Sequence, residues 1–148
     1  MAQRVTVTLH ELVSALDGYA EDVLQARHAV SFPHFAFLVA LAEEQPIDIT
    51  HLARCLGVTK AAVSKRVPAM VEGGWVQTSV DAANARRVVL SLTDKGATLV
   101  REAGGELEAL FADVFADPRL AAMGVDVPSL NRQLALLTTL IVAKGTPS

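Results

Sequence analysis

The stretch from Leu52 to Val67 reads LARCLGVTKAAVSKRV, and three of its residues have the spacing that two helices joined by a tight turn require. Ala53 is small enough to let the second helix approach the first. Gly57, four residues later, stands where the turn needs a positive φ, which glycine adopts without steric cost. Val63, six residues beyond Gly57, is placed to fill the space between the helices. This pattern predicts a helix-turn-helix.

Residues that cap or end helices divide most of the chain into helical segments. Ser31, Asp48 and Thr59 each stand at the start of a predicted helix, where a short polar side chain can accept a hydrogen bond from a free backbone N–H. Apolar residues recur at helical spacing in these segments and in both terminal regions. The predicted helices cover residues 9–29, 31–44, 48–57, 59–72 and 93–117, and a last one begins near residues 126–128.

Two short runs rich in residues that favour strands follow the second helix of the pair. They are WVQTS at 75–79 and RVVLSL at 87–92, and the polar segment between them, 80–86, predicts a hairpin with a long tip. A helix, a short helix, a longer helix and a hairpin in this order make a winged helix-turn-helix. We therefore predict a mainly α fold with a small β-hairpin, in which residues 31–96 form the winged helix-turn-helix of a single domain, residues 1–148.

Composition and charge limit the classes of protein to which the chain can belong. Hydrophobic residues make up 51% of the 148 residues and charged residues 20%, which is typical of globular rather than disordered proteins. The longest apolar run, residues 35–42, is too short to span a membrane, and the first residues lack the apolar core of a secretory signal, so we predict a cytoplasmic protein. The net charge is −3, but residues 51–93 carry six basic and two acidic side chains, a balance of +4 that leaves −7 for the rest. This asymmetry indicates that the central segment faces a polyanion.

The second helix of the pair divides into an apolar and an outward arc. At 100° per residue its apolar residues gather on one arc, which we expect to be buried: Val63, Val67, Met70 and Val71. Ala61 and Lys65 fall on the opposite arc, with Ser64 at its edge. Small residues beside a lysine suit an approach to base edges in the major groove of DNA. Lys60 and Arg66 lie nearer the flanks of this arc, which suits contacts to phosphates.

Two residues of the helix-turn-helix carry separate expectations. Pro68 lies inside the second helix, where it removes a backbone hydrogen bond. We expect the helix either to kink there, with the proline ring pointing outward, or to end early. Cys55 is the one cysteine of the chain, which excludes an internal disulfide, and beside Leu52 and Leu56 it is expected to be a small buried side chain.

The central part of the chain resembles a known family. From Asp48 to Gly96 it is similar to MarR-type transcriptional regulators: LARCLGVTKAAVSKRV matches their helix-turn-helix, and VEGGWVQTSVDAANARRVVLSLTDKG matches their wing. SFPHFAFLVALAE resembles the preceding helix. The resemblance implies a homodimer, held by helices in residues 5–29 and 97–144, that binds a roughly palindromic site on double-stranded DNA. It also implies release from DNA when a small aromatic or anionic effector enters a cleft between the two regions, and it favours a repressor.

The resemblance assigns roles to residues of the wing. Family members commonly end the hairpin tip with Asp, any residue, Arg and a small residue, and the matching positions are Asn84, Ala85, Arg86 and Arg87. Arg86 is thereby the candidate finger for the minor groove, where a narrow A·T-rich groove attracts a guanidinium. Asn84 departs from the pattern, because it offers the arginine a neutral acceptor in place of a carboxylate. Arg87, in place of a small residue, adds a candidate phosphate contact.

Two functions compete for such a chain. The first is a DNA-binding regulator whose DNA contacts are Thr59, Lys60, Ala61, Ser64, Lys65, Arg66, Asn84, Arg86 and Arg87, and whose effector contacts are His34 and Phe35. The second is a winged-helix module without DNA readout that binds a protein or a small ligand, as Pro68 and the acidic total would permit. A heme- or metal-linked sensor is a third, but the four histidines show no metal-ligand spacing with Cys55 or the carboxylates. No arrangement typical of a catalytic centre stands out, so we expect no enzyme activity, cofactor or metal.

Overall fold

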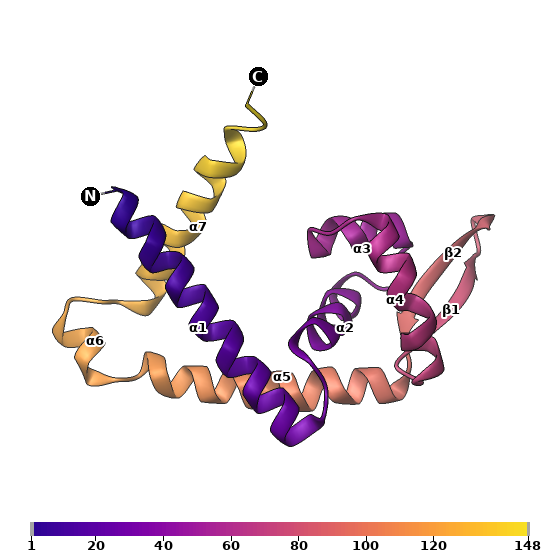
Figure 1. Ribbon diagram of the computed structural model, residues 1–148, viewed down its shortest axis with the longest axis horizontal. Coiled ribbons are helices and arrows are strands. Elements are labelled where there is room, and N and C mark those ends of the chain that lie inside the picture. The colour runs from indigo at the N-terminus through magenta and orange to yellow at the C-terminus, as the bar shows by residue number, and fades with distance from the viewer. Residues whose placement is uncertain (1, 148) are drawn as a thin grey trace. The chain divides into compact units, whose positions relative to one another are not determined.

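The computed structural model describes residues 2–147 and confirms a mainly α fold with one hairpin (Figure 1). The elements are α1 (Ala2–His28), α2 (Phe32–Glu44), α3 (Ile49–Leu56), α4 (Lys60–Glu72), β1 (Val76–Asp81), β2 (Asn84–Leu92), α5 (Asp94–Phe115), α6 (Pro118–Ala122) and α7 (Val127–Ala143). Contacts between residues divide the chain into two compact units, one up to Leu107 and one from Glu108. Each unit is described by itself.

The helix caps of the first unit lie where the sequence predicts them. The side chains of Ser31, Asp48 and Thr59 accept a hydrogen bond from the backbone N–H three residues on, at 3.2, 2.8 and 3.1 Å. Gly57 ends α3 with a φ of 68°, and its N–H donates to the carbonyl of Ala53. Because each of these groups meets a free group at a helix end, the turn between α3 and α4 is fixed locally.

The helix-turn-helix packs around two of the three residues whose spacing predicted it, and the third, Gly57, is exposed in the turn. Ala53 and Val63 are buried, and Leu52 has no exposed surface. Val71 is a correction: it was expected on the buried arc of α4, but it is 40% exposed, because it lies in the last turn of the helix. Cys55 is also exposed rather than buried. It stands two positions after the buried Ala53, which on a helix turns it to nearly the opposite side.

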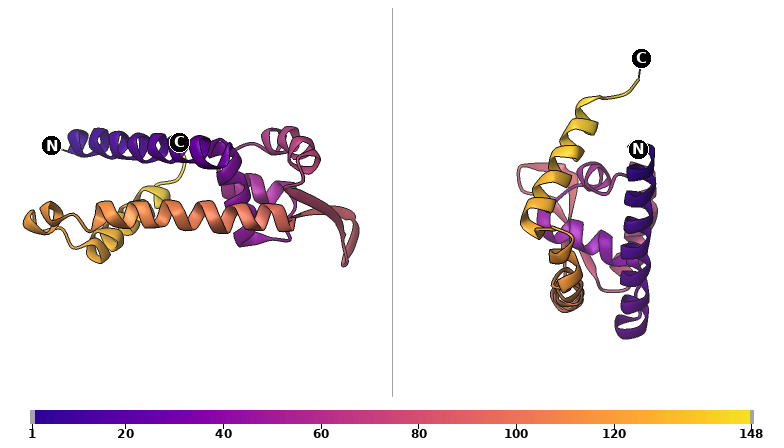
Figure 2. Two further views of the ribbon diagram at one scale, coloured as in Figure 1. Left: turned by 90° about the horizontal axis from the view of Figure 1, so that it is seen from below. Right: turned by 90° about the vertical axis from the view of Figure 1, so that its left-hand side faces the viewer.

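The two strands of the wing are longer than expected, and the turn between them is shorter. β1 pairs antiparallel with β2 from Val76 opposite Leu92 to Val80 opposite Val88, and the register then shifts so that Asp81 meets Asn84. The tip outside the strands is therefore residues 82–83 only, and the predicted long tip is wrong. Polar residues there join the strands instead of forming a loop. Figure 2 shows the hairpin projecting beyond the helices of this unit.

The hairpin is anchored to the rest of the first unit at its base. Ile47 forms an isolated antiparallel bridge to Leu90, with N–O distances of 3.1 and 2.8 Å. Thr93 is the one residue between β2 and α5, and its N–H donates to the carbonyl of Trp75. A Cβ added at Gly96, in the first turn of α5, would overlap that same carbonyl oxygen. Only glycine allows α5 to approach the hairpin this closely.

α1 and the first part of α5 complete the first unit. α1 begins seven residues before the predicted start, and Leu24, near its end, is fully buried. Arg27 and His28, at the end of α1, both contact the carboxylate of Glu106 on α5, with His28 Nε2 at 2.8 Å from Oε2. These two contacts join segments that are about eighty residues apart in the sequence.

The second unit contains the end of α5, α6 and α7. Pro118 was expected to end a long helix; α5 in fact ends at Phe115, and Pro118 is the first residue of the short helix α6. α7 begins at Val127, within the predicted start at residues 126–128, and Asp126 caps it. None of residues 108–147 is buried, and the exposed apolar side chains of this unit include Val114, Phe115, Leu136, Leu137, Leu140, Ile141 and Val142. In the part of the chain that the structure describes, no helix has the length and apolar character that crossing a membrane requires.

Candidate nucleic-acid interface

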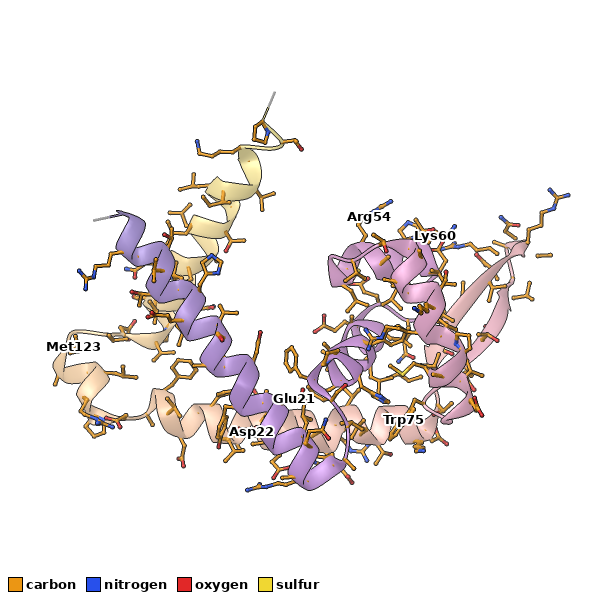
Figure 3. The ribbon with its side chains drawn as sticks, viewed as in Figure 1. Glu21, Asp22, Arg54, Lys60, Trp75 and Met123 are labelled. Carbon is orange, nitrogen blue, oxygen red and sulfur yellow. The ribbon has the colours of Figure 1, made fainter. Side chains whose placement is uncertain are left out.

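The beginning of α4 carries the side chains that were predicted to face DNA. Thr59, Lys60, Ala61, Ser64 and Lys65 are all exposed. The apolar residues Val63 and Met70 hold the opposite side of α4 in the core. Lys60 lies near Arg54 of α3 at the outer edge of the helix-turn-helix in the view of Figure 3. The arrangement provides a small, polar and basic surface without a large apolar side chain.

Arg66 differs from the other predicted phosphate contacts because it is held against α2. Its Nη2 donates to the Pro33 carbonyl oxygen at 2.8 Å, and its guanidinium lies 5.1 Å from the centre of the Phe37 ring. A guanidinium over an aromatic face is attracted by the negative charge of the ring face. Arg66 therefore joins α4 to α2. The sequence spacing placed it at the edge of the outward arc and gave no sign of this contact.

Pro68 does not end α4. The helix continues from Lys60 to Glu72, and the expectation that the helix ends early at Pro68 is wrong. The ring is exposed, as predicted. An outward proline loses one backbone hydrogen bond, but it displaces no side chain from the core. The beginning of α4 thus keeps its helical geometry.

Arg86 and Asn84 lie at the free end of the wing. Both are exposed, and the side-chain oxygen of Asn84 accepts a hydrogen bond from the backbone N–H of Arg86 at 3.1 Å. Asn84 thus supports the backbone of the candidate finger. Arg86 stands where the register of β1 and β2 is irregular.

Arg87 lies between two carboxylates. Its Nε donates to Asp48 Oδ2 at 2.9 Å and its Nη1 to Asp81 Oδ2 at 3.0 Å. The backbone N–H of His51, the His51 ring and the Arg87 guanidinium lower the pKa of Asp48 to about 2. Asp48 was predicted only as a helix cap, and sequence reasoning missed its second role. The pairing joins residues 39 positions apart, so no local pattern reveals it.

The structure separates the two residues that were predicted to bind an effector. His34 lines an open hollow of about 390 Å³ with Lys65 and Arg66, whereas Phe35 is buried and faces Gly104 of α5. The His34 ring stands edge-on to Trp75 at 5.1 Å between centres; Figure 3 marks Trp75 near the start of α5. Phe35 does not line the hollow.

The imidazole of His34 carries a buried atom with an unmet hydrogen bond. Within residues 2–147, no group satisfies its Nε2. Burial lowers the pKa of His34, and the cations Arg66 and Lys95 lower it further. The ring is therefore neutral near pH 7, and its buried Nε2 has no hydrogen-bond partner within the described residues.

Comparison with known proteins identifies the family. Residues 30–87 match the model of the MarR family. The transcriptional regulator AdcR of Streptococcus pneumoniae serotype 2 is 34% identical to the chain over 107 residues, which cover 64% of this chain and 73% of that protein. The chain belongs to the MarR family. The MarR-type resemblance and the winged helix-turn-helix predicted from the sequence are thereby confirmed.

Solved structures of other regulators share the fold of this MarR-family chain. MarR of Staphylococcus aureus, solved with salicylate and kanamycin, has a TM-score of 0.79 at 16% identity and covers 98% of this chain and 94% of its own. Sco3205 of Streptomyces coelicolor, a MarR-family regulator solved with DNA, has a TM-score of 0.75 at 22% identity and covers 99% of this chain and 88% of its own. At these identities the likeness is one of fold.

Proposed function

We propose that this MarR-family chain regulates transcription by binding double-stranded DNA sequence-specifically in the cytoplasm. The observation that carries the proposal is the exposed beginning of α4, where small residues and a lysine stand clear of the core. Ala61, Ser64 and Lys65 would face base edges in the major groove, and Thr59 and Lys60 would contact phosphates. The first residues of the second helix read the bases in helix-turn-helix proteins, so Pro68 lies outside the reading part.

The wing would add a second contact to the same site. Arg86 extends from the tip, as the minor-groove finger requires, and Asn84 supports its backbone. A guanidinium in a narrow minor groove gains from the concentrated negative potential there. Residues 31–96 would thus form the DNA-binding region, with one helix and one finger in adjacent grooves.

The DNA-binding form would be a homodimer. In the second unit no side chain from residue 108 to 147 is buried, although α7 carries a row of apolar residues. On α1, Val5, Leu12 and Val13 are each about half exposed. Apolar surface on terminal helices is what a second copy would cover, so residues 5–29 and 97–144 are the proposed dimerisation helices. Two identical subunits related by a twofold axis would read a roughly palindromic site.

The dimer would act as a repressor that a small effector releases. A bound dimer can occlude a promoter, and the hollow beside His34 supports a site for a small anionic or aromatic ligand. Two cations, Lys65 and Arg66, line that hollow together with His34. A ligand there would engage Lys65, which the proposal also assigns to DNA. Ligand and DNA would therefore compete for one side chain.

Fluorescence anisotropy with the DNA upstream of the chain's own gene tests the proposal. The expected result is tight binding that weakens steeply with salt, with a slope of about −0.9 in log K against log salt for each phosphate contact. Arg86→Ala should weaken this binding, and an unrelated duplex should bind far less tightly. Equal, weak binding to both duplexes would contradict DNA readout and would favour a winged-helix module for a protein or small ligand.

A further inference from the structure

We infer that Arg87 is a positioning residue: it holds the wing against the helix-turn-helix through Asp48 and Asp81 and does not contact a phosphate. This inference rests on the proposed DNA binding for its functional consequence, but its structural part concerns the free protein. This role differs from the phosphate contact that was expected of Arg87. It also gives the cap residue of α3 a part in setting the position of the wing.

The pairing of the two wing strands is irregular next to the tip of the hairpin. Val80 pairs with Val88, and the next pair is Asp81 with Asn84, so three residues of β2 lie between the two paired positions without a partner on β1. A bulge of this kind bends a strand and interrupts its ladder of backbone hydrogen bonds. The Nη1 of Arg87 reaches across it to Asp81 at 3.0 Å. This ion pair takes the place of the missing backbone pairing.

A line of contacts connects β2 to the segment that joins α2 to α3. These contacts run from the base of the hairpin toward its tip and link Gln45 Oε1 to Leu92 N, Ile47 to Leu90 and Asp48 Oδ2 to Arg87 Nε. Their order is that of a further antiparallel strand. Arg87 makes the last of them, and it is the one that depends on two side chains.

The guanidinium of Arg87 lies in negatively charged surroundings. Two carboxylates lie within hydrogen-bonding distance of Arg87, and its side chain is 40% exposed. To bind a phosphate, it would have to leave both carboxylates or bring them toward the polyanion. Arg86, one residue earlier on β2, is exposed instead. The chain thus uses one arginine to hold the wing and presents its neighbour to DNA.

The position of the wing decides whether both contacts to DNA can form together. The minor-groove finger and the beginning of α4 belong to one rigid body only if the hairpin is fixed to the helix-turn-helix. Without Arg87 the base of the hairpin stays attached through the Ile47–Leu90 bridge, but the part beyond Val88 can bend. We call the contacts of Arg87 with Asp48 and Asp81 the brace. Without the brace the finger would be misplaced, so binding to DNA would weaken, while the number of displaced counterions would stay the same.

The experiment compares the salt dependence of Arg87→Gln and Asp48→Asn with that of Lys60→Gln. Asparagine is as good a helix cap as aspartate, so Asp48→Asn removes the ion pair and leaves the cap of α3 in place. We expect Arg87→Gln and Asp48→Asn each to weaken binding about 3–10-fold at fixed salt without a change of slope. Lys60→Gln, the matched control, should reduce the slope by about 1 per subunit, because it removes a phosphate contact.

The opposite assignment makes opposite predictions for the same variants. If Arg87 contacts a phosphate, Arg87→Gln reduces the slope as Lys60→Gln does. Asp48→Asn then frees the arginine and removes a negative charge, so binding becomes tighter. Either result overturns the inference. The double variant Asp48→Asn with Arg87→Gln should bind no more weakly than either single variant, since both remove one interaction.

Amide hydrogen exchange on the free protein separates this inference from the proposed function. Ser79 and Val89 are the hydrogen-bonded pair nearest the irregularity, because Leu90 turns its N–H away from β1 to Ile47. In both Arg87→Gln and Asp48→Asn, exchange at Ser79 and Val89 should become several-fold faster, and in Lys60→Gln it should stay unchanged. Unchanged exchange in all three variants overturns the brace even if the chain binds DNA. Faster exchange supports the brace even if the chain binds no DNA, in which case the proposed function fails alone.

Discussion

The guanidinium of Arg66 lies over the ring of Phe37, 5.1 Å from its centre. This contact joins α4 to α2, and with the hydrogen bond to the Pro33 carbonyl oxygen it makes Arg66 part of the packing between the two helices. A residue chosen from the sequence as a phosphate contact therefore has a measurable role in stability.

Arg66→Gln should lower the free energy of unfolding by about 1–2 kcal/mol, because it removes a cation–π contact and a charge-assisted hydrogen bond. Urea unfolding followed by circular dichroism measures the change. Lys65→Gln is the matched control; its side chain is exposed, so a change within about 0.5 kcal/mol is expected. Equal effects of the two variants would show that Arg66 does not stabilise the packing.

Gly57→Ala should destabilise the protein by about 1 kcal/mol or more. The φ of Gly57 is 68°, which a residue with a Cβ adopts at a cost, although the space around it is open. Gly105→Ala, in the exposed interior of α5, also meets open space and should be neutral or stabilise by about 0.5–1 kcal/mol. Thermal unfolding of the two variants gives the comparison, and the same sign for both would contradict the conformational explanation.

Asp48 should make stability depend on pH in the acid range. Its pKa is lowered to about 2 in the folded protein, below the usual value of 3.8. A carboxylate of this kind stabilises the fold above its unfolded pKa, and the contribution is lost as pH falls through the folded pKa. The difference in unfolding free energy between the native chain and Asp48→Asn should therefore be constant above about pH 5 and shrink toward pH 2. A difference that does not change between pH 6 and pH 3 would contradict this role.

Ile141→Asp should convert a dimer to a monomer. Ile141 is 67% exposed on α7, and a carboxylate there would be buried without a partner in a dimer interface. Sedimentation equilibrium should show a loss of the proposed dimer of at least tenfold, and binding to the proposed palindromic site should fall with it. Gln133→Glu, an exposed polar position on the same helix, is the control. A chain that is monomeric before substitution would refute the dimer.

Local signals were enough to predict most elements of the fold. Ser31, Asp48 and Thr59 cap helices where a short polar side chain precedes an apolar pattern, because a cap needs only its own helix end. The hairpin tip was predicted too long, since residues such as Asp81 favour turns by composition but here extend the strands. Cys55 was misplaced because Leu52, Ala53 and Leu56 share one face of α3 and Cys55 lies outside that face, although it is next to them in the sequence.

The candidate site was only partly predictable for a related reason. The exposure of Ala61 and Lys65 follows from helical geometry alone, so the outward face of α4 could be derived. The partners of Arg66 and Arg87 lie 33 and 39 residues away along the chain, and their contacts depend on how the elements pack. Charge marked both arginines as basic surface, and only tertiary structure shows that each is held within the protein.

Thr93 is the one residue between β2 and α5, and this short connection makes the hairpin and the first turns of α5 one rigid unit. The N–H of Thr93 donates to the Trp75 carbonyl, and Gly96 lies against the same carbonyl with no room for a side chain. These contacts hold the start of α5 against the hairpin. Because no flexible loop separates the two elements, a rotation of the first turns of α5 would also rotate the wing. In the proposed dimer, a change in the direction of this end of α5 would therefore move the wing with it.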